Sequence, residues 1–101
     1  MNKERILSTL GLAYVASGLV SGEEFTLKEI KRGRAYLVFL ASDAGPNTTK
    51  RVSDKSLFYH SRIIHDFTSL ELSKAIGKDN RKALAITNQK FAKLLRDALN
   101  E

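Results

Sequence analysis

The feature that most constrains the fold is a nearly unbroken apolar run over residues 35–41, Ala-Tyr-Leu-Val-Phe-Leu-Ala. Strands that are covered on both faces typically have this composition, because neither face meets water. Residues 82–87, Lys-Ala-Leu-Ala-Ile-Thr, have the same buried-strand character. Two strands of this kind favour a sheet with helices on both sides over a helical bundle or a barrel.

Shorter strands are predicted at Leu19–Val20 and within residues 62–67, and helical segments separate the strands. Apolar spacing predicts the inner faces of the helices, with these members: Ile6, Leu7, Leu10, Ala13, Tyr14, Leu27, Ile30, Val52, Ser56, Tyr59, Phe91, Leu94, Leu95 and Ala98. The predicted order is one helix followed by four strand–helix units. This order indicates an α/β fold, a three-layer α-β-α sandwich with a mixed sheet of about four strands, in a single domain over residues 1–101.

Residues of particular types mark the helix ends. Ser21 and Glu24 have the spacing of a capping box, which would start the second helix, and Thr68 and Glu71 repeat that spacing. The other boundaries are indicated by proline or asparagine at a start and by glycine after an end: Pro46, Asn88, Gly33 and Gly77.

The composition favours an anionic partner. Seventeen Lys and Arg residues against 11 Asp and Glu residues give a formal net charge of +6 and an isoelectric point near 9.8. The absence of cysteine excludes disulfides and cysteine-ligated metals. No apolar stretch reaches the roughly 18 residues of a membrane span, and the N-terminus lacks the apolar region of a signal peptide. We therefore expect a cytoplasmic protein with no membrane partner.

Catalysis has little support in the sequence. His60 and His65 belong to no recognisable nucleophile motif, and no phosphate-binding or dinucleotide-binding glycine pattern is present. Glu23 and Glu24 are better explained as acids that complement the dipole of a first helical turn. We expect a protein that is not an enzyme and that holds no cofactor and no metal.

The pattern of basic residues is more informative. Lys28, Lys31 and Arg32 lie on the second helix, whose start adjoins Gly22, and a helix N-terminus with nearby lysines can bind a phosphate backbone. More basic residues flank Gly77: Lys74, Lys78, Arg81 and Lys82. We expect the loops at 21–22 and 68–69 to lie near each other and form one surface. A protein-interaction module with an acidic partner and a small-molecule enzyme remain as alternatives.

Six short stretches resemble one known family. They are Leu10-Gly-Leu-Ala13, Val20-Ser-Gly-Glu23, Lys28-x-Ile30, Ala35-x-Leu-Val38, Asp43-Ala44 with Asn47-Thr48, and Ala75-Ile-Gly-Lys78. In this order they resemble the L-seven-Ae/L-thirty-e ribosomal-protein family, which binds kink-turn RNA, and within it the small bacterial YlxQ-type branch. The resemblance implies an α-β-α sandwich in which the start of the second helix enters an RNA kink.

The resemblance also implies roles for single residues. Family members read sheared G·A pairs with a Gly-x-Asn-Glu-x-x-Lys run, in which Gly22 and Lys28 occupy the glycine and lysine positions. Glu24 and Phe25 stand where asparagine and glutamate are expected, so the reading groups differ. An ionised glutamate only accepts hydrogen bonds, whereas asparagine also donates them, and phenylalanine can stack on a base. The loop at Gly77–Asn80 corresponds to a second family surface, which packs against unpaired bases.

Together these arguments predict a monomeric, non-catalytic protein that binds structured ribosomal or other non-coding RNA, with the ribosome a candidate partner and no DNA partner. The predicted RNA-binding residues are Ser21, Gly22, Glu23, Glu24, Phe25, Lys28, Lys31, Arg32, Thr68, Gly77, Lys78 and Asp79.

Overall fold

The computed structural model describes residues 1–101, which form five helices and four strands. The helices are α1 (Lys3–Val15), α2 (Glu23–Lys31), α3 (Pro46–Phe58), α4 (Ser69–Ala75) and α5 (Gln89–Leu99). The strands are β1 (Leu19–Ser21), β2 (Leu37–Leu40), β3 (Ile63–Ile64) and β4 (Ala83–Ile86). The predicted order of elements is confirmed, although β3 is shorter than the segment predicted at 62–67.

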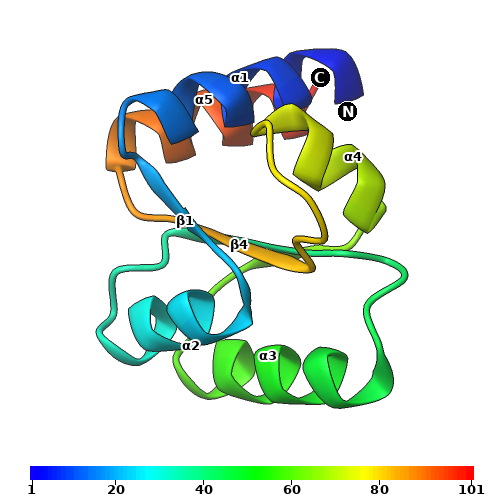
Figure 1. The fold of residues 1–101 in the computed structure, drawn as a ribbon. Coiled ribbons are helices and arrows are strands. Elements are labelled where there is room, and N and C mark those ends of the chain that lie inside the picture. Colours follow the sequence, from blue (N-terminus) through cyan, green and yellow to red (C-terminus); the bar gives the residue numbers. More distant parts are fainter.

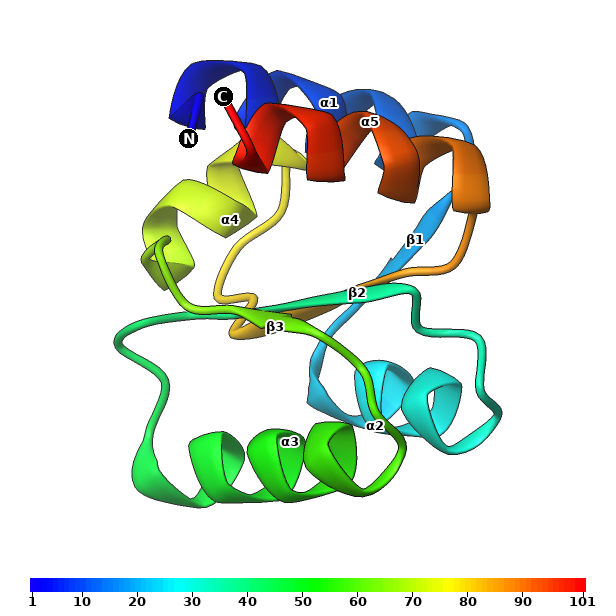
Figure 2. The ribbon, with the colours of Figure 1, turned by 180° about the vertical axis from the view of Figure 1, so that it is seen from behind.

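The elements form three layers. Figures 1 and 2 show α1, α4 and α5 on one face of the sheet and α2 and α3 on the other. Helices α1 and α5 lie side by side, and the two chain termini meet at their ends. The predicted three-layer α-β-α sandwich is therefore confirmed. None of the five helices combines the length and hydropathy that crossing a bilayer requires.

The sheet has the strand order β1-β4-β2-β3. Strand β4 is antiparallel to both of its neighbours, β1 and β2, while β3 runs parallel to β2. Consequently β1, β2 and β3 all point in one direction, and β4 returns between them. The sheet is mixed, as predicted, with an order that the sequence pattern did not specify.

The two central strands are buried on both faces. In β2, Leu37 and Phe39 contact the three-helix side, whereas Val38 and Leu40 contact the side of α2 and α3. Strand β4 divides in the same way, with its larger residues toward the three-helix side and the small Ala83 and Ala85 toward α2. This period-two alternation explains why both strands appear in the sequence as continuous apolar runs.

Most of the predicted helix ends are confirmed. Gly33, with φ of 70°, ends α2 in a Schellman motif, since its N–H donates to Ile30 and the next N–H donates to Glu29. Thr68 and Glu71 form the predicted capping box at α4, and Asn88 caps α5. Two inner-face predictions are wrong. Tyr59 is 41% exposed because it follows the last turn of α3, and Leu94 is 44% exposed.

The exposure of Leu94 follows from the rotation of α5 about its axis. The residues that α5 buries against the sheet and α1 are Ala92, Leu95, Ala98 and Leu99. The prediction identified the helix correctly but included Leu94, which lies on the outer side of the buried face.

Helices α1 and α4 approach closely at Gly11. A Cβ atom added there would lie 2.8 Å from the backbone carbonyl oxygen of Ala75, a separation that real Cβ atoms do not show. Because the obstacle is backbone, a side-chain rotation cannot relieve the contact.

We expect Gly11→Ala to lower the free energy of unfolding by about 1–3 kcal/mol, the usual cost of overpacking. In an open helical position the same change is stabilising by roughly 1 kcal/mol, so the sign itself is diagnostic. Urea denaturation measures the effect, with Leu12→Ala on the exposed side of the same helix as control. A Gly11→Ala protein that is more stable than wild type would contradict the close approach.

Candidate nucleic-acid interface

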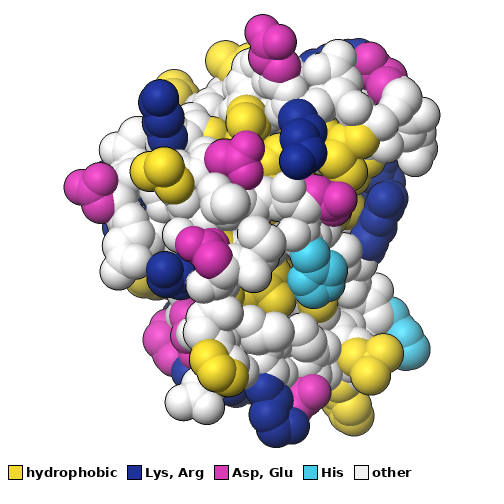
Figure 3. Space-filling view, turned by 90° about the vertical axis from the view of Figure 1, so that its right-hand side faces the viewer, with side chains coloured by type: hydrophobic (Ala, Val, Ile, Leu, Met, Phe, Trp, Pro, Cys, Tyr) yellow, Lys and Arg dark blue, Asp and Glu magenta, His cyan; other side chains and the backbone are white.

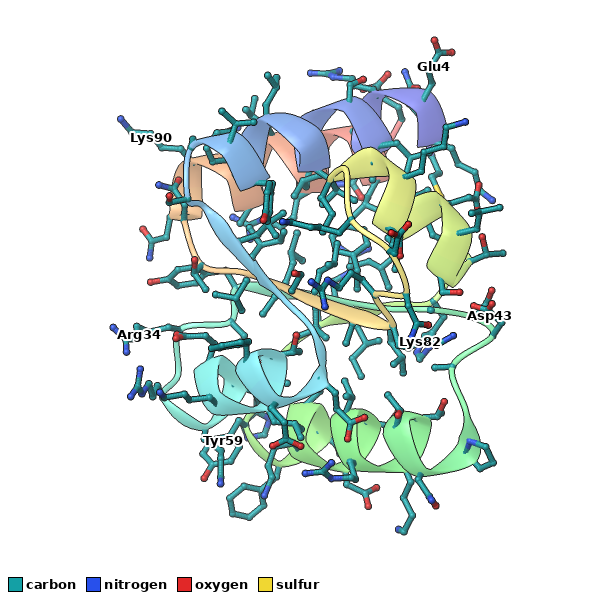
Figure 4. All side chains as sticks on the ribbon, in the orientation of Figure 1. Glu4, Arg34, Asp43, Tyr59, Lys82 and Lys90 are labelled. Atoms are coloured by element: carbon teal, nitrogen blue, oxygen red, sulfur yellow. The ribbon has the colours of Figure 1, made fainter.

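Four loops meet at one end of the sheet, where β1, β2 and β3 finish and β4 begins; we call this the loop end. Backbone hydrogen bonds join the neighbouring segments across it: the Gly22 N–H donates to Ala83 at 2.9 Å, and the Ala41 N–H donates to Lys82 at 2.8 Å. Figure 4 shows Asp43 and Lys82 at this end and Arg34 at the opposite one. The topology thus gathers the starts of α2, α3 and α4 together with the loop that precedes β4.

The start of α2 differs from the predicted one. Ser21 remains in β1, paired with Leu84, and Gly22 is the N-cap residue. The predicted Ser21–Glu24 capping box is therefore wrong, because an extended strand residue cannot also cap the helix that begins after Gly22. Gly22 has φ of 100° and ψ of 153°, a conformation that essentially only glycine adopts. No side chain caps α2, so the backbone N–H groups of its first turn have no protein acceptor.

The two acids in the first turn of α2 are held by α3. Thr48 donates its hydroxyl hydrogen to Glu23 at 2.6 Å. The Arg51 guanidinium pairs with the Glu23 carboxylate and, at 3.0 Å, with that of Glu24. The hydrogen bond to Glu24 and the charges of both acids raise the pKa of Arg51. Glu23 is thereby a clamp between two helices, whereas the side chain of Glu24 stays 77% exposed.

Asp43 ties the loop after β2 to the start of α4. Its carboxylate accepts hydrogen bonds from the Ser69 backbone N–H and from the Ser69 hydroxyl, each at 2.8 Å. The backbone bond first, and then the hydroxyl bond, hold the pKa of Asp43 below its ordinary value of 3.8. Beside it, Thr68 is occupied by the capping box with Glu71, so its polar groups already have protein partners.

The loop between α4 and β4 is the basic part of the loop end. Gly77, with φ of 69°, ends α4 in a Schellman motif, and the buried Ser73 hydroxyl accepts the Arg81 N–H at 2.8 Å. The Nζ atom of Lys78 lies 5.6 Å from the centroid of the Tyr14 ring. A hollow of about 540 Å³ opens between α4 and this loop, lined by Ser69, Leu70, Ser73, Lys74, Gly77, Lys78, Asp79 and Asn80.

The predicted RNA-binding residues fall into three groups. The first, at the start of α2, contains Ser21 to Glu24, and the second contains Gly77 to Asp79. The third, Phe25 with Lys28, Lys31 and Arg32, runs along α2 away from the loop end. Thr68 shares the loop end with Gly22 but sits at the other edge of the sheet, because β4 and β2 lie between β1 and β3.

The third group lines a groove of about 720 Å³ between α2 and α3, which we call the α2–α3 groove. Its walls are formed by Glu24, Phe25, Leu27, Lys28, Lys31, Arg32, Arg51, Asp54 and Lys55. The contributions of Arg51 and Lys55 were not predicted from the sequence. No local pattern could identify them, because they depend on how α3 packs against α2.

The loop end is mixed in charge. Figure 3, which faces it, shows acidic side chains between basic ones. The acids of α2 lie on one side. On the other side, four basic residues have no carboxylate within ion-pair distance: Lys74 in the last turn of α4, and Lys78, Arg81 and Lys82 in the loop before β4. The Nε atom of Arg81 is buried without a hydrogen-bond partner. Arg81 and Lys82, which the sequence pattern already placed beside Gly77, lie at this loop end, although neither was among the predicted binding residues.

An α-β-α sandwich with this strand order and a row of loops around a glycine-started α2 defines a class of small ribosomal-protein-like domains. The chain belongs to the Ribosomal protein L7Ae/L30e/S12e/Gadd45 family, which matches residues 4–96. The resemblance noted in the sequence is confirmed.

Individual relatives agree with this assignment. The chain is 37% identical over 98 residues to the RNA-binding protein YlxQ of Enterococcus faecium, covering 97% of this chain and 94% of the relative. It is 43% identical over 86 residues to the RNA-binding protein YlxQ of Bacillus subtilis (strain 168), covering 85% and 86%.

Solved structures show the same fold. A protein of unknown function from Bacillus halodurans C superposes with a TM-score of 0.88 at 35% identity, covering 96% of this chain and 98% of the other. The Giardia lamblia 15.5kD RNA binding protein superposes with a TM-score of 0.82 at 16% identity, covering 96% and 83%. At that identity the second likeness concerns the fold alone.

We expect Asp43→Ala to lower the melting temperature at neutral pH, because the bonds to Ser69 are removed. The lowered pKa fixes the sign of the pH dependence. The carboxylate stabilises the fold above pH 3.8, and this contribution disappears as the pH falls through the still lower pKa of the folded state. In a series of thermal melts from neutral to acidic pH, the difference in melting temperature between Asp43→Ala and wild type should therefore become smaller. Asp66→Ala, an exposed acid whose carboxylate accepts no hydrogen bond, is the control; a gap that is independent of pH would contradict this account.

Proposed function

We propose that this protein binds structured RNA at the loop end and that it acts without catalysing a reaction. Membership of the L7Ae/L30e/S12e/Gadd45 family carries the proposal, together with two relatives that match most of the chain and are named RNA-binding proteins. Ribosomal or other non-coding RNA is the expected partner. Within such an RNA, a kink-turn is the element that the family resemblance favours.

The geometry of the loop end supports this proposal in two ways. The first turn of α2 presents backbone N–H groups that no side chain caps, and such groups bind anionic oxygens. Gly22 carries no side chain, and nothing lies within 4 Å of where a Cβ would be, so RNA can approach the backbone there. Lys28 and Lys78 would then neutralise phosphates on either side.

Glu24 and Phe25 make the reading of bases different from that of the Gly-x-Asn-Glu-x-x-Lys pattern. Glu24 can accept hydrogen bonds from guanine amino groups, but its carboxylate already accepts one from Arg51 at 3.0 Å. Phe25 is 62% exposed and offers a ring face for stacking. We therefore assign base discrimination within the kink to Glu24, whereas the ring of Phe25 is placed to stack an unpaired base that adjoins the kink.

The decisive experiment compares binding to a short kink-turn RNA and to a straight duplex of equal length across a salt series. We expect tighter binding to the kinked RNA and an affinity that falls steeply with salt, because neutralised phosphates release counterions. The Lys28→Ala/Lys78→Ala double variant should weaken binding and flatten the salt dependence, by about one unit of slope for each phosphate that the protein no longer neutralises.

Lys90→Ala/Lys93→Ala is the control, since it removes the same formal charge from the first half of α5, which follows the other end of the sheet; Figure 4 shows Lys90 far from the loop end. If the two double variants weaken binding equally, the affinity depends on the net charge of the protein and not on the loop end. Weak binding to both RNAs, with retention of an acidic protein instead, would favour a protein-interaction module.

We expect Glu24→Gln to change the preference among RNAs while leaving the stability of the free protein nearly unchanged, because Glu24 is exposed and Arg51 keeps Glu23. Glutamine both donates and accepts, so it can pair with base edges that repel a carboxylate. The measurement is a set of affinities for kink-turn RNAs that differ only in their tandem G·A pairs. A uniform change across the whole set would mean that Glu24 does not read bases.

A further inference from the structure

The α2–α3 groove holds an excess of cations that the protein itself does not neutralise. Its two acids are already engaged, Glu24 by Arg51 at 3.0 Å and Asp54 by Lys50 at 2.9 Å. Lys28, Lys31 and Lys55, by contrast, have no carboxylate within ion-pair distance. The space between the helices is therefore lined by three unpaired ammonium groups, a charge pattern that suits a polyanion.

The three lysines are arranged to follow a chain of charges and not a single ion. Lys28 and Lys31 are separated by three residues, roughly 4.5 Å along the axis of α2. Lys55 stands on the opposite wall, and packed helices are roughly 8–10 Å apart. A phosphate backbone lying in the groove would meet ammonium groups from both sides.

Phe25 indicates what kind of polyanion fits. It is the third residue of α2, and it lies at the end of the groove nearest the loop end, 62% exposed and without an aromatic partner. An exposed aromatic ring beside lysines is the arrangement on which unpaired bases stack. A duplex keeps its base faces inside its own stack, whereas every nucleotide of an unpaired strand carries both a phosphate for the lysines and a base face for the ring.

We infer that the α2–α3 groove takes a single-stranded RNA segment, with its phosphates on Lys31 and Lys55 and its first base against Phe25. This inference rests on the proposed function, because Lys28 and Phe25 join the groove to the start of α2. An RNA whose structured part occupies the loop end would thus continue, unpaired, between the two helices. Neither the family assignment nor the names of the relatives specify an RNA-binding role for the α2–α3 groove.

The test uses one structured kink-turn core in three forms: alone, with a short uridine extension at the 5′ end, and with the same extension at the 3′ end. For the wild-type protein we expect one extension to tighten binding by about tenfold, the order of effect that stacking on an aromatic ring produces. Lys55→Ala should remove most of this gain and leave the affinity for the core alone unchanged.

Two further variants separate stacking from charge. Phe25→Ala should abolish the gain and Phe25→Tyr should preserve it, whereas Lys90→Ala on the opposite layer should have no effect. Melting temperatures of all variants establish that each one is folded. A polyphosphate chain that competes with the extension as well as an equally charged uridine strand would overturn the inference, because it would show attraction without stacking.

A separate arm keeps the two proposals distinguishable. The uridine strand alone is titrated at low salt against wild type and Lys55→Ala. If the core binds and neither extension adds affinity, the groove inference fails while the proposed function stands. If the core fails to bind but the strand alone binds through Lys55 and Phe25, the groove holds and the loop-end proposal fails. Absence of binding to every RNA would overturn both.

Discussion

The return of β4 between β1 and β2 is the constraint on which the rest of the molecule depends. Because β4 is antiparallel to both neighbours, its first residues lie beside the last residues of β1 and β2, and the hydrogen bond from Gly22 to Ala83 results directly. The small side chains of Ala83 and Ala85 also let α2 lie close against the sheet. Without this strand, the start of α2 and the loop after α4 would not share one surface.

The charged residues that hold the helices together differ from those that are available for binding a ligand. Arg51 pairs with both Glu23 and Glu24 and so joins α3 to α2, which engages these three charges within the protein and leaves one negative charge in excess. The lysines of the α2–α3 groove and those around Gly77 have no such partners. Two groups of basic residues without carboxylate partners therefore flank the acidic start of α2. An anionic chain that touches both places must pass the exposed N–H groups of that helix.

The sequence predicted the parts of the fold that depend on local spacing. The buried runs at residues 35–41 and 82–87 became β2 and β4, and the Thr68–Glu71 capping box formed as expected. Strand order could not be predicted, because pairing depends on contacts between distant segments. For the same reason the candidate site omitted Arg51 and Lys55, whose positions depend on how α3 packs against α2. Phe25 and Lys28 could be proposed because they lie within a few residues of the start of α2.

The failed prediction at Ser21 is itself informative about the loop end. On the three-helix face, α1, α4 and α5 are each capped by a side chain, whereas α2 and α3 both start at glycine without one. Glycine in place of a capping side chain costs only a few tenths of a kcal/mol, so the fold is destabilised little by it. Keeping Ser21 in β1 leaves the N–H groups of α2 without an acceptor at the position where the acids of its first turn are already engaged by α3. The start of α2 thus lacks a side-chain cap at little cost in stability, and its N–H groups are open to solvent. This combination is expected where a ligand supplies the missing hydrogen-bond acceptors.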